Sequence, residues 1–88
     1  MNLAELTERM KSLKDWSLEG NAIIKDFPFS NFKEALDFVN KVGEIAEENN
    51  HHPSIIINYN IVKLSLTTHS AGDLTEKDFL VAEEIDKL

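Results

Sequence analysis

The sequence has no cysteine, only two prolines and three glycines, and no apolar run of membrane-spanning length. Without cysteine the chain has no disulfide, no thiolate nucleophile and no cysteine-ligated zinc. So few prolines and glycines argue against a disordered or low-complexity chain. The amphipathic stretch 1–16 carries charges of both signs and does not resemble a signal peptide. We therefore expect a cytoplasmic protein that makes no contact with a membrane.

Basic residues are also scarce. Nine Lys and Arg against 16 Asp and Glu give a formal net charge of −7. Affinity for a phosphate backbone depends on clustered Lys and Arg, so no direct binding of nucleic acid is expected. The 88 residues are enough for one domain, residues 1–88. Its core would be modest, so association with further copies of the chain would help to stabilise it.

Apolar spacing and capping residues predict three helices and two hairpins. The expected elements span residues 3–14, 16–18, 22–29, 31–50, 54–59, 61–69 and 75–88. Their order is α-β-β-α-β-β-α. This order is typical of an α+β fold, with a four-stranded antiparallel sheet and helices packed on one face.

Two apolar patterns go beyond what such a fold needs. In the second helix, Phe38 and Ile45 widen the hydrophobic stripe. The run Ile55–Ile57 places apolar side chains on both faces of its strand, which predicts burial on two sides, as at a subunit contact. Trp16 is expected to pack in the core or at its rim. These patterns favour a homo-oligomer.

All three histidines are predicted to meet at one edge of the sheet. His51 and His52 directly precede one strand, and His69 lies near the end of the next. The start of one antiparallel strand lies beside the end of its neighbour. Imidazoles exchange protons near neutral pH, and each general acid or base step contributes roughly 10²- to 10⁴-fold to a rate. Thr67 and Thr68 add hydroxyl groups to the same edge.

Structural alternatives exist for each of these residues. A single histidine after a helix is commonly an exposed end residue, Glu47 a solvated helix charge, and Asp78 the cap of Thr75. Three histidines could instead bind Zn²⁺ with an open fourth position. Adjacent side chains on extended backbone point in opposite directions, however, and no HxH or HxxxH spacing is present. The pattern therefore favours acid–base chemistry without a metal.

The stretch "EENNHHPSIIINY" and the later "YNIVKLSLTTHSAGDLTEKDF" identify a family resemblance. The chain resembles the pterin-4a-carbinolamine dehydratases, also known as dimerization cofactors of homeodomain transcription factors. The family pattern is an acidic residue, His-His-Pro, an aromatic residue, a histidine and an aspartate at fixed intervals. It is matched here by Glu47, His51, His52, Pro53, Tyr59, His69 and Asp78. Trp16, "FPFSNF" and the Ala46-Glu47 helix end extend the likeness over the whole chain.

The resemblance implies a lyase that converts 4a-hydroxytetrahydropterin to quinonoid dihydropterin during tetrahydrobiopterin recycling, with no metal or organic cofactor. His51 and His69 would be the acid–base pair, His52 would position the substrate, and Glu47 would support His51. The residues expected to line the pterin are Asn50, His51, His52, Thr67, Thr68, His69 and Ser70. A dimer or tetramer is implied, and the alternative is a non-catalytic role in stabilising a transcription-factor dimer.

Three positions depart from many relatives. Asn50 stands where many have Asp, Ile55 where many have Trp, and Lys77 where many have Arg. None of these changes touches a histidine. The first removes a charge next to the expected site, so the electrostatics of the site can differ from those of relatives.

Overall fold

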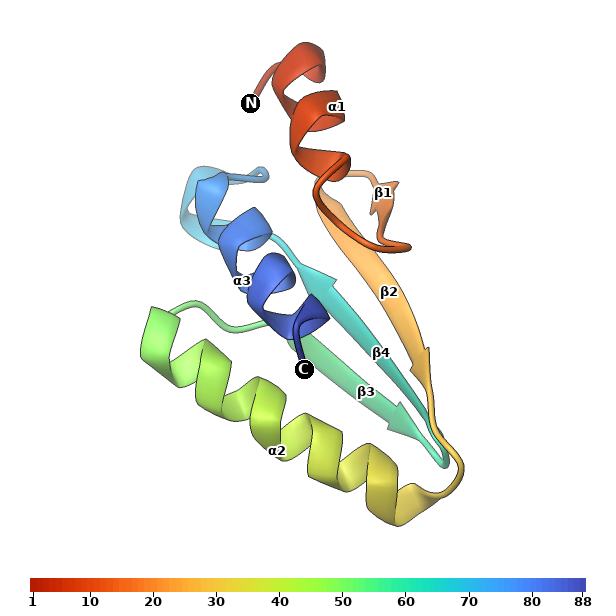
Figure 1. Cartoon of the computed structure of the whole chain (residues 1–88). Helices are drawn as coiled ribbons and strands as arrows, with labels where there is room; N and C mark the ends of the chain where they lie inside the picture. The colour runs from red at the N-terminus through yellow and green to blue at the C-terminus, as the bar shows by residue number, and fades with distance from the viewer.

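A computed structural model describes all 88 residues and has the predicted order of elements. These are α1 (Leu3–Met10), β1 (Ser17–Glu19), β2 (Ala22–Pro28), α2 (Phe32–Asn49), β3 (Ser54–Asn58), β4 (Ile61–Leu66), a 3₁₀ turn η1 (His69–Ala71) and α3 (Glu76–Asp86). The strands form one antiparallel sheet in the order β1-β2-β4-β3. Helices α2 and α3 lie on the same face of this sheet, and α1 lies at the end near β1 (Figure 1). The predicted α+β fold is confirmed.

Polar side chains set the helix ends where the sequence places them. Asn2 and Glu5 form a capping box at α1, and the Asn31 side chain accepts a hydrogen bond from the Glu34 N–H at α2. Helix α1 ends at Met10, four residues before the predicted end. After it the chain turns toward the sheet, and the Lys14 N–H donates to the Asp86 carboxylate at 2.9 Å.

Strand β4 is the centre of the core. Its side chains Val62, Leu64 and Leu66 are completely buried, and each contributes roughly 1.5–3 kcal/mol by leaving water. A shift by one residue would bury Lys63 in their place, so the register is strongly determined. The core cluster contains Trp16, Ile23, Ala35, Val42, Val62, Leu64, Leu66, Leu74, Phe79, Val81, Ala82 and Ile85.

The edge strand β3 packs against the core on one face only. Ile55 and Ile57 pack against the core, but Ile56 is 56% exposed. Within the single chain the helices cover only one face of the sheet, so burial of Ile56 at a subunit contact stays a prediction. On α2, the apolar side chains of Phe32 and Leu36 are also exposed.

The C-terminal end of α3 is fastened to the sheet by a carboxylate. Asp86 accepts hydrogen bonds from the Trp16 indole N–H and from the Lys25 ammonium, both at 2.9 Å. Its side chain is 6% exposed and that of Lys25 13%, so water screens this ion pair only weakly. Trp16 is buried beside it, as its predicted packing role requires.

Helix α1 is fastened to α3 through Arg9. Its guanidinium contacts Glu83 at 2.6 Å and Glu76 at 2.8 Å, and lies 5.5 Å from the centre of the Phe79 ring. Burial by itself would lower the pKa of Arg9, but the hydrogen bonds and charges of Glu83 and Glu76 raise it overall. The charged side chain of Arg9 therefore holds α1 against α3. None of the three helices combines the length and the apolarity needed to cross a bilayer.

Candidate active site

The end of α2 delivers the paired histidines. Asn50 adopts the left-handed conformation, with φ of 48°, and its N–H donates to the last turn of the helix. The His51 N–H closes this turn on the Ala46 carbonyl at 3.1 Å. Pro53 then prevents the helix from continuing, and β3 begins at the next residue. The predicted helix end at residues 49–50 is confirmed.

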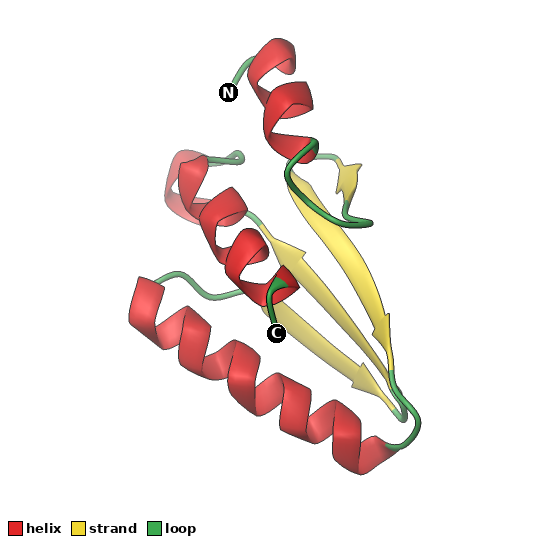
Figure 2. Cartoon of the chain, in the orientation of Figure 1, coloured by secondary structure: helices red, strands yellow, loops and turns green.

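The end of β4 delivers the third histidine from the other side. The strand stops at Leu66, so the prediction of a strand through His69 is wrong. The reason is local: the Thr68 N–H pairs with the Asp73 carbonyl, and the Gly72 N–H donates to the His69 carbonyl. These bonds draw residues 69–72 into a 3₁₀ turn. The loops after α2 and after β4 lie at the same end of the sheet (Figure 2).

These two segments and the first turn of α3 enclose a hollow of about 310 Å³. No hydrophobic side chain lines it. The lining residues are Asn50, His51, His52, Thr67, Thr68, His69, Ser70 and Lys77. All seven residues expected from the sequence to line the pterin therefore border one cavity, as strand pairing predicted for the histidines. Lys77 is the additional residue. The hydrogen bond of 2.8 Å between the Thr68 and Thr75 hydroxyls holds this turn beside the hollow, and the capping box at Thr75 does not by itself predict that contact.

His51 is held by a buried carboxylate. Its Nε2 lies 2.6 Å from Oδ1 of Asp78, which is completely buried, while the His51 side chain is 11% exposed. The other Asp78 oxygen accepts from the Thr68 hydroxyl at 2.8 Å and from the Thr75 N–H at 2.9 Å. A carboxylate in this network only accepts, so His51 donates its Nε2 proton to it. Its Nδ1 lone pair is left for the chemistry of the site.

His52 has a different partner. Its Nε2 is hydrogen-bonded to Glu47 one helical turn earlier, and both side chains are largely exposed. The expectation that Glu47 supports His51 is therefore wrong, because the His51 ring contacts Asp78 on α3 and Glu47 contacts His52. Asp78 takes the expected place of Glu47. From the sequence, Asp78 was expected to cap Thr75, which it does, and it belonged to the family pattern without an assigned partner.

His69 borders the hollow without a partner of its own. Its ring makes no hydrogen bond or ion pair within the chain, and the residue is exposed. Both ring nitrogens are therefore available to a ligand. This contrasts with His51, one of whose nitrogens is committed to Asp78.

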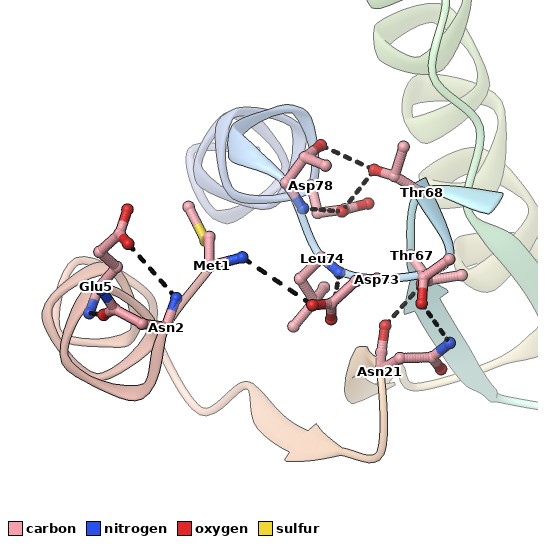
Figure 3. A network of polar contacts seen from close by, with 11 residues as sticks. Met1, Asn2, Glu5, Asn21, Thr67, Thr68, Asp73, Leu74 and Asp78 are labelled. Carbon is pink, nitrogen blue, oxygen red and sulfur yellow. Dashed lines mark hydrogen bonds and ion pairs between the residues drawn. The ribbon is translucent and has the colours of Figure 1, made fainter. Parts of the chain in front are cut away.

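The loop that carries His69 is anchored from distant parts of the chain. The Thr67 hydroxyl donates to the Asn21 carbonyl at 2.6 Å, and the N-terminal amine lies 3.9 Å from Asp73 (Figure 3). Figure 3 also shows Thr68 reaching Asp78 on α3. The position of His69 thus depends on the β1–β2 turn and on the N-terminus as well as on β4.

Two other kinds of site can be compared with this one. No three His, Asp or Glu side chains lie close enough together to hold a metal ion. A larger hollow of about 490 Å³ lies between β2, α2 and the end of α3, where Phe27, Phe38 and Lys41 line it. It contains no histidine. All three histidines of the chain line the smaller, polar hollow.

A small α+β fold with a polar hollow, three histidines and a carboxylate behind one of them is an arrangement typical of enzymes that transfer protons. Comparison with known proteins specifies the family. The family model described as pterin 4 alpha carbinolamine dehydratase matches residues 1–88. The chain belongs to this family.

Relatives match this chain over almost its whole length. A Chloroflexus aurantiacus protein, provisionally named a pterin-4-alpha-carbinolamine dehydratase, is 51% identical over 97% of this chain and 91% of its own. A Sulfurisphaera tokodaii protein with the same provisional name is 50% identical over 96% of this chain and 90% of its own. The crystal structure of a Brucella melitensis protein, described as a transcriptional coactivator/pterin dehydratase, is similar with a TM-score of 0.93 and 31% identity. It covers 99% of this chain and 95% of that one.

Proposed function

We propose that this chain is a hydro-lyase that dehydrates 4a-hydroxytetrahydropterin to quinonoid dihydropterin, as in tetrahydrobiopterin recycling. The observation that carries the proposal is the hollow bordered by His51, His52 and His69, with Asp78 behind the first. Its volume of about 310 Å³ suits a bicyclic ring with a short substituent. Family membership supplies the substrate class.

The reaction needs two proton transfers. The C4a–O bond breaks, the hydroxyl leaves as water with a proton from an acid, and a base removes the N5 proton as the C4a=N5 bond forms. His51 suits the base, since its Nδ1 is free and Asp78 stabilises the imidazolium that results. His69, free at both nitrogens, suits the acid. Water is the only by-product, so atoms and charge balance.

The remaining residues would bind and orient the ring. His52 sits beside the base and is steadied by Glu47, which fits a role in positioning. Asn50 and Ser70 offer hydrogen bonds to the pterin's amide and amino groups, and the Thr67 hydroxyl, which donates its proton to Asn21, can still accept one. Thr68 is the exception, because its hydroxyl is engaged by Asp78 and Thr75. It would act mainly by holding Asp78 in place.

The direct test generates the carbinolamine in solution and follows the pterin absorbance with and without the protein. We expect the protein to accelerate dehydration by at least the roughly 10²-fold that one acid–base group supplies. The same acceleration is expected in the presence of a chelator. A rate equal to that of buffer or of heat-denatured protein would refute the proposed function.

We further propose that the chain acts as a homo-oligomer, a dimer or tetramer. Strand β3 leaves an unpaired edge, and Ile56 on its uncovered face is 56% exposed. Replacing Ile56 with Lys is expected to weaken association about tenfold or more, because it puts a charge on an apolar contact surface. Sedimentation at micromolar concentration measures this. A monomeric wild-type protein would contradict the proposal.

A second candidate function is protein binding without catalysis. The Brucella melitensis relative is described as both a coactivator and a dehydratase, which favours keeping this alternative. The acidic surface, with a net charge of −7, would suit a protein partner. A partner that binds wild type and His51→Ala equally would separate this role from the lyase. In either role we propose that residues 1–88 work as one domain in the cytoplasm.

A further inference from the structure

The residues that line the polar hollow differ in charge from the rest of this acidic protein. The chain carries 16 acidic residues against nine basic ones, yet none of the eight residues that line the hollow is Asp or Glu. Lys77 is the only Lys or Arg among them, beside the three histidines. Building on the proposed function, we infer that the site takes a pterin whose side chain carries a phosphate, and that Lys77 pairs with this group.

Lys77 is free to do so. It is exposed, and none of the ion pairs within the chain includes it. Its neighbour Glu76 is the nearest carboxylate in sequence on the exposed side of α3, but it is paired with Arg9 at 2.8 Å. Arg9 is a guanidinium and keeps its positive charge at neutral pH. Glu76, the carboxylate that could compete for Lys77, is thus already paired with Arg9.

The carboxylates nearest the histidines are engaged as well. Asp78 is completely buried and accepts from His51, Thr68 and Thr75. Glu47 is hydrogen-bonded to His52 and does not line the hollow. A ligand therefore meets a cation and several polar side chains, with no acidic group among them. This lining repels an anion far less than the rest of the acidic surface does.

The chemistry of the lining suits a phosphate. Lysine binds phosphate as a flexible point charge, and hydroxyl groups such as that of Ser70 donate to its oxygens. Lys77 lines the same hollow as His51 and His69, so it can meet a substituent of a ring that lies against the two histidines. Lys77 lies on the first turn of α3, next in sequence to Asp78. The same helix therefore positions the lysine that would bind the phosphate and the carboxylate that holds His51.

The experiment uses a matched pair of pterins, one with a neutral trihydroxypropyl side chain and the other its phosphate monoester. Binding of their oxidised forms is measured by fluorescence titration, and turnover of their carbinolamines by absorbance. Wild type is expected to prefer the phosphate ester about tenfold in Kd and in KM, which corresponds to about 1.4 kcal/mol. In Lys77→Gln the ratio of the two Kd values is expected to fall to about one.

Two variants control for other effects. Lys77→Arg keeps the charge and is expected to retain most of the preference. Lys63→Gln removes an exposed lysine on the uncovered face of the sheet, outside the hollow, and is expected to leave the ratio unchanged. The preference should also shrink as salt rises, because the lysine is exposed.

The outcomes separate the two proposals. A wild type that binds both pterins equally, or a Lys77→Gln variant that keeps the preference, overturns the role of Lys77. A preference in binding without turnover of either carbinolamine refutes the lyase and leaves the phosphate site standing. A loss of both ligands alike in Lys77→Gln would show a structural role and also overturn the inference.

Discussion

Replacing His51 with Ala is expected to lower kcat for carbinolamine dehydration about 10³-fold, within the usual range for removal of a general base. The loss should fall on kcat because Nδ1 of this ring acts on the proton that leaves in the transition state. His51 is 11% exposed, so its removal leaves a small cavity near Asp78. Stopped-flow absorbance of the reaction, together with thermal unfolding of the variant, measures both effects.

The neighbouring histidines supply the comparison. His69→Ala is expected to lower kcat by a similar factor, whereas His52→Ala should chiefly raise KM, because its ring positions the substrate. Added imidazole should restore part of the activity of His51→Ala by occupying the cavity. Equal rates for wild type, His51→Ala and His69→Ala would rule out the acid–base assignment.

Replacing Asp78 with Asn is expected to lower kcat at least 10²-fold while preserving the shape of the side chain. The Asn amide can donate to His51 Nε2, which would move the ring proton to Nδ1 and remove the lone pair that the base needs. It also leaves His51⁺ without a compensating buried charge. Stability should fall by about 2–4 kcal/mol, since the carboxylate is completely buried and joined to Thr68 and Thr75. The pH–rate profile and chemical denaturation distinguish the two effects.

Asp86→Asn is the matched control for Asp78→Asn. Asp86 is also a nearly buried carboxylate on α3, but it joins Trp16 and Lys25 at the far end of the helix. Its replacement is expected to reduce stability without changing kcat at temperatures where the protein stays folded. If both variants lose kcat in proportion to their loss of stability, Asp78 has only a structural role.

Local rules explain why much of the fold was predictable. The caps at Asn2 and Asn31 and the alternation of Val62, Leu64 and Leu66 depend on neighbours a few residues away. The meeting of the histidines required one further rule, that antiparallel strands bring the start of one beside the end of the next. This rule was sufficient although β4 ended three residues before His69.

Contacts between elements were not predictable in the same way. Asp78 lies 27 residues from His51, and its position depends on how α3 packs on the sheet. Glu47 is closer in sequence and was expected from the family resemblance to support His51, but in the structure its partner is His52. The exposure of Ile56 likewise depends on β3 being at the edge of a sheet that is covered on one face.

The sequence by itself determined the α+β order, the family and the gathering of three histidines, because spacing, caps and strand pairing act through the backbone. Only the tertiary structure decided which carboxylate holds which histidine and that acidic groups are absent from the lining of the hollow. Side-chain pairing across elements depends on helix packing and on rotamers, and an interval along the chain does not encode either. The proposed proton chemistry of the site therefore depends on the position of α3.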